Sequence, residues 1–285
     1  MEGIHLQDQG KYSFPCLNNP LESGKNPLQT IGIVGGMGPM AGVELHRRII
    51  TSLSVDKDQD HPSVIHISRS RNIPDRTEFL NGLVSENPAG SIVQVIQELD
   101  QLGADVVGIP CNTSHAYPIF SRISEEVDHL GLKVGLRNMV LETAAYVASV
   151  LPSITRLGIL CTNGSYEARL YEQELAIAGL EAIYPDRQLQ YEMVHQLIYD
   201  PAIGIKCSRS IHGSHEKRLQ LIMGYFEDRG VDAILLGCTE LSLLPQSWFL
   251  GYSLVDPLTV LATSLLGDSR AQSEPLFHGS QLAEV

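Results

Sequence analysis

The sequence lacks the long apolar runs that would place a protein in or across a membrane. No stretch approaches the length of a membrane-spanning helix, and residues 1–20 contain no continuous apolar segment typical of a signal peptide. We therefore expect a cytoplasmic protein that has no membrane partner and keeps its cysteines reduced.

Cysteines are few, and none of them forms a close pair. The chain has 5 cysteines at wide spacings, with no CxxC motif: Cys16, Cys111, Cys161, Cys207 and Cys238. Structural zinc sites usually draw on such close pairs, and disulfide frameworks belong mainly to small exported domains. The cysteine pattern therefore disfavours both a zinc site and a disulfide framework.

Positive charge is also scarce. The chain has 20 Lys and Arg residues against 33 Asp and Glu residues, which is a formal net charge of −13. Phosphate groups would be repelled, so binding to nucleic acid or to a membrane surface is disfavoured. A small anionic substrate stays possible, because a pocket can be locally basic.

A nucleotide-binding motif is missing as well. Gly35, Gly36 and Gly38 follow an apolar strand, but their spacing matches neither GxGxxG nor a P-loop. Two interpretations of this glycine loop stay open. Its backbone amides could hold a carboxylate at the start of a helix, or the glycines could only allow a tight turn.

What is present is a regular alternation of strands and helices in 285 residues, enough for one large domain or two smaller ones. The expected elements are strands at 30–36, at 61–68 and from 104, and helices at 39–53 and 91–103. This order is typical of an α/β fold with a parallel sheet.

The same order of elements recurs later in the chain. The segments 30–38, 97–103 and 104–114 resemble 156–164, 224–230 and 231–241, at offsets of 126 or 127 residues. Any two strand–helix units look somewhat alike, but the matching glycines and Cys-containing strand ends favour a duplication. We predict two similar parallel-sheet α/β domains related by a pseudo-two-fold axis.

The repeat and the flanking polar segments give a division of the chain. We predict an N-terminal extension at 1–28, a first α/β domain at 29–138, a second at 139–253 and a polar tail at 268–285. Both end segments are poor places to look for chemistry, because they lack the apolar residues that would tie them down.

Two cysteines occupy equivalent strand ends in the two repeats. Cys111 is followed by Asn112 and Thr113, and Cys238 is followed by Thr239 and Glu240. Ligands of parallel sheets bind beyond the carboxyl ends of the strands. We expect both thiols to meet in one cleft between the domains, each before a helix whose N-terminus favours the thiolate.

Two opposed thiols suit a reaction that moves a proton from one face of a carbon to the other. Racemisation needs a base on one face and an acid on the opposite face, and tuned thiols can serve as both. A free cysteine often only packs in a core. Equivalent placement favours function for Cys111 and Cys238, whereas we interpret Cys161 and Cys207 as packing residues.

The motifs also carry a family resemblance over about residues 30–260. The segments IVGGMGP, NIPDRT, PCNTSH, GIK and LGCTEL resemble the aspartate/glutamate racemase family, in particular its aspartate racemase branch. The glutamate racemase branch has a histidine after its second Cys-Thr, where this chain has Glu240. The resemblance implies an enzyme that racemises an acidic amino acid, with aspartate favoured, without pyridoxal phosphate or metal.

The resemblance also implies roles for single residues. Cys111 and Cys238 match the catalytic cysteines, and Arg76 and Lys206 match the basic residues that hold substrate carboxylates. Positions that line the substrate are matched by Met37, Asn112, Thr113 and Thr239. Family members often form homodimers, and their C-terminal segment, here about 254–267, rejoins the first domain.

Several alternatives stay open at this point. The same fold could serve a maleate isomerase or decarboxylase type cysteine enzyme, or a non-catalytic amino-acid-binding protein. Aspartate and glutamate differ by one methylene, which a pocket distinguishes only modestly. Arg69 and Arg71 are either surface charges or specificity residues, and His115 and His195 are interpreted as structural.

Overall fold

The computed structural model describes residues 29–207 and 213–267. The predicted extension with Cys16 and the predicted polar tail therefore lie outside the described residues. Within the described ranges, no helix combines the length and the apolar character needed to cross a membrane.

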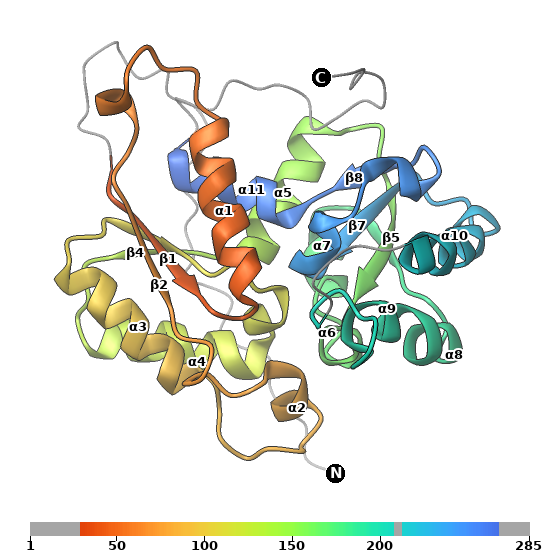
Figure 1. The fold of residues 1–285 in the computed structure, drawn as a ribbon, viewed down its shortest axis with the longest axis horizontal. Coiled ribbons are helices and arrows are strands. Elements are labelled where there is room, and N and C mark those ends of the chain that lie inside the picture. Colours follow the sequence, from red (N-terminus) through yellow and green to blue (C-terminus); the bar gives the residue numbers. More distant parts are fainter. Residues whose placement is uncertain (1–28, 208–212, 268–285) are drawn as a thin grey trace.

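Two parallel sheets of four strands each form the framework (Figure 1). The first has the order β2-β1-β3-β4, from Val64–Ser68, Ile31–Gly35, Val106–Gly108 and Gly135–Arg137. The second has the order β6-β5-β7-β8, from Glu181–Ile183, Arg156–Cys161, Ala233–Gly237 and Ser253–Val255. The predicted fold class is confirmed.

The strand pairing follows the sequence repeat residue by residue. Ile31 of β1 pairs with Val106 of β3, and Leu157 of β5 pairs with Ala233 of β7. These are the residues that the repeat makes equivalent. Central strands of parallel sheets are covered on both faces, and β1, β5 and β7 are accordingly buried along their whole lengths or nearly so.

Helices connect the strands. They are α1 (Pro39–Thr51), α2 (Arg76–Leu80), α3 (Ala89–Gln101), α4 (Tyr117–His129), α5 (Met139–Val150), α6 (Asn163–Glu167), α7 (Glu172–Ile177), α8 (Arg187–Leu189), α9 (His195–Tyr199), α10 (Gly213–Glu227) and α11 (Pro257–Leu266). Helix α1 begins at Pro39, a residue that suits the first turn because it has no N–H to leave unpaired. Helix α3 is followed by Gly103, whose φ of 86° is one that glycine adopts readily.

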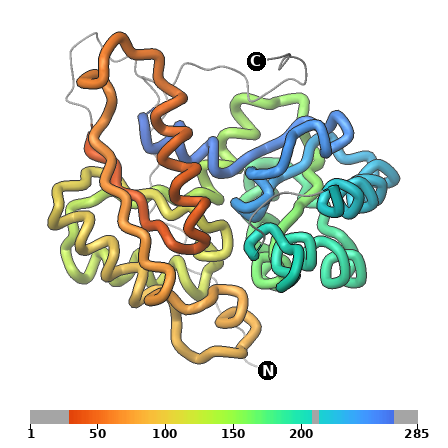
Figure 2. The backbone as a smooth tube through the Cα atoms, in the orientation of Figure 1, coloured from red at the N-terminus to blue at the C-terminus, as the bar shows by residue number. Residues whose placement is uncertain are grey.

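The last helix crosses from the second sheet to the first. Strand β8 pairs with β7, and the chain, blue in Figure 2, then passes back toward the first sheet as α11. Leu258 and Leu261 of α11 pack with Ile33 of β1. Helix α5 makes the opposite crossing, because it follows β4 yet packs Val140 and Val147 against the second sheet. The crossing to the first sheet thus begins after Val255, and the domain limits at 138 and 253 stay a prediction.

A partly buried ion-pair network fixes this crossing. Asp256 caps α11 by accepting from the Leu258 amide at 2.9 Å, and it also accepts from the guanidinium of Arg48 on α1. Glu44 accepts from the same guanidinium at 2.8 Å, and Ser242 donates to Asp256 at 2.9 Å. The network therefore joins α1, α11 and the segment that follows Cys238.

Candidate active site

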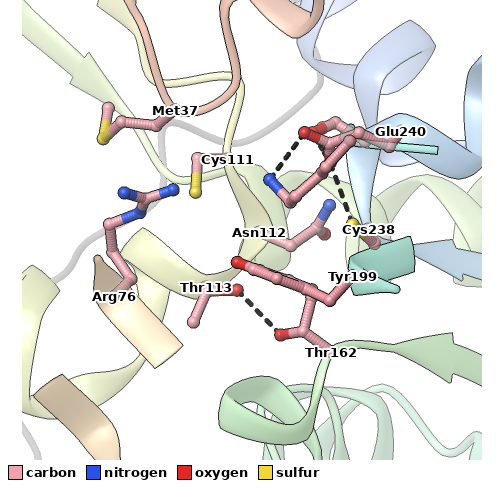
Figure 3. Close-up of a pocket in the computed structure, with 11 residues that line it drawn as sticks. Met37, Arg76, Cys111, Asn112, Thr113, Thr162, Tyr199, Cys238 and Glu240 are labelled. Carbon is pink, nitrogen blue, oxygen red and sulfur yellow. Dashed lines mark hydrogen bonds and ion pairs between the residues drawn. The ribbon is translucent and has the colours of Figure 1, made fainter. Parts of the chain in front are cut away.

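One small pocket brings together residues from the ends of both sheets (Figure 3). Its lining contains all eight residues that the sequence picked out: Met37, Arg76, Cys111, Asn112, Thr113, Lys206, Cys238 and Thr239. Three further lining residues are Thr162, Tyr199 and Glu240. Both cysteines are nearly closed off from solvent, at 5% and 4% exposure.

Cys111 follows β3 and precedes the short 3₁₀ helix Asn112–His115. The guanidinium of Arg76, the first residue of α2, lies beside its thiol (Figure 3). Burial opposes the charge of Arg76, but the neighbouring Cys111 and Asp75 raise the pKa of the guanidinium above its usual value. A fixed cation next to a thiol favours the thiolate, which is the reactive form.

Two buried donors in this pocket have spare hydrogen-bonding capacity. Among the described residues, the Nε of Arg76 and the Nδ2 of Asn112 find no hydrogen-bond partner. The other end of the Asn112 amide is held, because the Tyr171 hydroxyl donates to its Oδ1. Buried donors are normally satisfied, so these two indicate an anionic or carbonyl-bearing ligand.

Cys238 has a different environment. It follows β7, and its thiol donates to Oε2 of Glu240 at 3.0 Å. Burial and the Glu240 carboxylate raise the pKa of Cys238 well above its usual value. The sequence-based expectation that both strand ends favour a thiolate is therefore wrong for Cys238, because burial and the carboxylate two residues along outweigh the short 3₁₀ helix.

Lys206 is paired within the pocket. Its Nζ donates to Oε1 of Glu240 at 2.7 Å, and the ring of Tyr199 lies 5.1 Å from the same nitrogen. Burial would lower the pKa of Lys206, but Glu240 raises it above its usual value. Lys206 is thus a buried cation held ready in the pocket, with a carboxylate that a ligand would have to displace or share.

Tyr199 joins the two halves across the pocket. It ends α9, and its hydroxyl donates to Oδ2 of Asp75 at 3.2 Å. The other carboxylate oxygen of Asp75 caps α2, accepting from the Thr77 amide at 2.8 Å. Because Arg76 is the next residue, the same carboxylate positions both Tyr199 and the start of the helix that carries Arg76.

Buried hydroxyls and two glycines let the halves approach closely. Thr113 contacts Thr162 at 3.2 Å and Ser165 at 3.0 Å through hydroxyl oxygens. A Cβ on Gly38 would lie 2.7 Å from Oε1 of Glu240, and one on Gly164 would lie 2.9 Å from the Cα of Thr77. These glycines are equivalent in the repeat, so each half contributes one close approach to the other.

The three further lining residues were marked weakly or not at all by the sequence motifs. Thr162 is the repeat equivalent of Gly36, so the repeat could have pointed to it. Glu240 stood out only as a branch marker, although it directly follows Cys238-Thr239. Tyr199 belongs to no motif, and only the fold brings it to the pocket.

The remaining residues with sequence-based expectations have plain placements. His115 donates from Nδ1 to the carbonyl of Cys111 at 2.9 Å, and His195 accepts from the Asn163 amide at 3.3 Å, both structural contacts. Arg69 pairs at the surface with Glu98. Cys161 is buried in the core of the second sheet, but Cys207 is exposed, so its interpretation as a packing residue is wrong.

Comparisons with known proteins agree with this geometry. The sequence profile of the family described as "Asp/Glu/Hydantoin racemase" matches residues 34–265. The chain belongs to this family. The broad specificity amino-acid racemase RacX of Bacillus subtilis is 25% identical over 238 residues, which are 82% of this chain and 95% of that protein.

Solved structures of other proteins share the fold. The aspartate racemase of Picrophilus torridus aligns with a TM-score of 0.69 and 24% identity, covering 84% of this chain and 94% of that one. The glutamate racemase of Francisella tularensis aligns with a TM-score of 0.58 and 17% identity, covering 83% and 79%. Both have the same two-domain α/β architecture.

Proposed function

We propose that this protein racemises an acidic amino acid, aspartate in the first place, by a two-base mechanism that uses Cys111 and Cys238. The observation that carries the proposal is the pair of thiols at equivalent strand ends, both lining one pocket together with Arg76 and Lys206. Figure 3 shows the two cysteines on different sides of that pocket.

In this mechanism one thiolate removes the α-proton and the opposite thiol supplies a proton to the other face. The electron pair left on the α-carbon is delocalised into the α-carboxylate, whose growing charge needs donors and cations around it. Arg76, Asn112 and Lys206 are the groups in the pocket that supply them. The reverse reaction exchanges the roles of the thiols.

The two thiols have different charged neighbours. The guanidinium of Arg76 lies beside Cys111, and the carboxylate of Glu240 lies beside Cys238. Cys238 therefore carries its proton in the resting enzyme, where it can act as the acid for a proton removed by Cys111. This arrangement suits the enantiomer whose α-proton faces Cys111, and the opposite enantiomer requires the two thiols to exchange roles.

The family resemblance supports a reaction without pyridoxal phosphate or metal. The carbanion would then be stabilised by the protein alone, through the buried donors already described. The same resemblance supports a homodimer in the cytoplasm, which light scattering and cell fractionation would test. The choice between aspartate and glutamate rests on Glu240 as a marker of the aspartate branch.

The test is direct. The purified protein, treated with a chelator and given no cofactor, is incubated separately with L- and D-aspartate and with L- and D-glutamate. Chiral chromatography should show the opposite enantiomer, and Cys111→Ser and Cys238→Ser should each abolish its formation. Full racemisation by either variant would exclude the two-thiol mechanism.

Two other outcomes would redirect the proposal. A covalent adduct between a cysteine and an unsaturated diacid would favour a maleate isomerase type reaction. Tight binding of aspartate in calorimetry, without exchange of its α-proton in heavy water, would favour a non-catalytic amino-acid-binding protein.

A further inference from the structure

One buried carboxylate touches both a proposed acid–base thiol and a proposed substrate-binding cation. Glu240 accepts from the thiol of Cys238 with Oε2 and from the ammonium of Lys206 with Oε1, at 3.0 Å and 2.7 Å. Its side chain is only 6% exposed. Water therefore does little to stabilise its charge, and the protein's own groups decide its protonation.

The charge of Glu240 depends on Lys206. Burial would raise the pKa of Glu240, but Lys206 and the Cys238 thiol hold it below its usual value. Lys206 and Cys238 are the titratable groups that face this carboxylate, and Tyr199 faces Lys206 from α9. A ligand carboxylate that draws Lys206 away would leave the effect of burial dominant and make Glu240 a stronger base. Lys206 also lowers the pKa of Cys238, but its hydrogen bond goes to Glu240, so its departure changes Glu240 more.

We propose that Glu240 is a positioning residue that stores the proton of Cys238 when a substrate carboxylate takes Lys206. The S–H bond of Cys238 breaks, an O–H bond forms on Oε2 of Glu240, and the electron pair stays on sulfur as the thiolate. No other reactant is needed. The inference rests on the proposed racemisation, and it assigns Glu240 to the enantiomer whose α-proton faces Cys238.

The other thiol has a different neighbour. The guanidinium of Arg76 lies beside Cys111, whereas Glu240 contacts Cys238, so a substitution of Glu240 leaves the neighbour of Cys111 in place. Loss of proton storage at Glu240 should therefore affect one face of the substrate only. Glu240→Gln preserves the shape of the side chain and an oxygen that can accept from the thiol, but it cannot take the proton.

The experiment follows exchange of the α-proton of L-aspartate and of D-aspartate separately in heavy water. In Glu240→Gln, exchange should fall on the order of 100-fold for the enantiomer whose exchange Cys238→Ser also abolishes. Exchange of the other enantiomer should persist. The kcat/KM for racemisation should fall equally in both directions, because the two enantiomers have the same free energy.

Two further variants make the result decisive. Glu240→Asp keeps a charge for Lys206 and should show a smaller loss on the same enantiomer, which tests the proposal even if Glu240→Gln folds poorly. Glu125→Gln, at an exposed position of α4, should change neither exchange rate. Equal loss for both enantiomers, or no loss, in the Glu240 variants would overturn the proposal. A wild-type protein that neither exchanges nor racemises would instead overturn the proposed function.

Discussion

At the scale of single residues, the pocket is asymmetric although the chain is a repeat. The two thiols occupy equivalent strand ends, yet one lies beside a guanidinium and the other beside a carboxylate. The donors around them come from unrelated positions, Arg76 from α2 and Lys206 from the turn after α9. Duplication thus explains where the thiols are, and later divergence explains how each is tuned.

His115 provides a residue-scale prediction about pH. Burial lowers the pKa of His115 to about 4, so the imidazole is neutral in the folded protein at neutral pH. The usual pKa of a histidine is near 6.5, so below pH 6.5 the unfolded chain takes up a proton that the folded protein does not. The free energy of unfolding should therefore fall by about 3 kcal/mol between pH 6.5 and pH 4.

The measurement is urea unfolding of wild type and His115→Gln across this pH range. The stability difference between the two proteins should shift by about 3 kcal/mol as pH falls from 7 to 4. His129→Gln removes an exposed histidine of α4 and should show no such shift. A difference that stays constant with pH would contradict the neutral, buried state of His115.

At the scale of elements, the site depends on how closely the segments after β1 and β5 approach the opposite half. Gly38 and Gly164 occupy equivalent positions there, and each leaves space for a group of the other half. The strand starts show the same symmetry. Asp105 accepts from the Thr30 amide at 2.7 Å, and its repeat equivalent Asp232 accepts from the Arg156 amide at 2.8 Å.

Gly164→Ala tests the close approach. A methyl group there would meet the backbone of Thr77, so α2 with Arg76 must shift, and we expect a loss of about 1–3 kcal/mol in stability together with lower activity. The matched control is Gly224→Ala in α10, where a Cβ meets nothing within 4 Å and should stabilise by about 0.5–1 kcal/mol. Both glycines lie in helices, so equal effects in thermal unfolding would contradict the steric argument.

At the scale of the whole molecule, the two halves are joined by exchanged helices. Helix α5 leaves the first sheet and packs on the second, and α11 leaves the second sheet and packs on the first. A pocket between two halves keeps its geometry only if the halves are held in register. The partly buried network of Arg48, Glu44 and Asp256 provides polar contacts of this kind.

Arg48→Met tests that network. Removing the cation leaves Asp256 and the partly buried Glu44 without it, so we expect a loss of about 2–3 kcal/mol in urea unfolding. Arg47→Met removes the adjacent arginine, which also contacts Glu44 but has a side chain that is 59% exposed. That variant should lose no more than about 1 kcal/mol. Similar losses in both variants would show that the partly buried network contributes little.

Much of the site could be predicted because its residues lie in short sequence motifs, two of which recur in the repeat. Apolar periodicity indicated the strands and helices, and the offset of the repeat indicated two equivalent sheets before any strand pairing was known. The motifs after each strand then pointed to eight residues that the structure brings to one pocket. Their catalytic and binding roles stay predictions.

The sequence by itself determined the fold class, the duplication and the positions of the two thiols, because strand ends and repeat offsets are local properties of a chain. Only the tertiary structure decided that Glu240 joins Lys206 to Cys238 and that Tyr199 reaches Asp75. Such pairs arise where separate loops meet in space. At that meeting point, burial and the Glu240 carboxylate together raise the pKa of the Cys238 thiol.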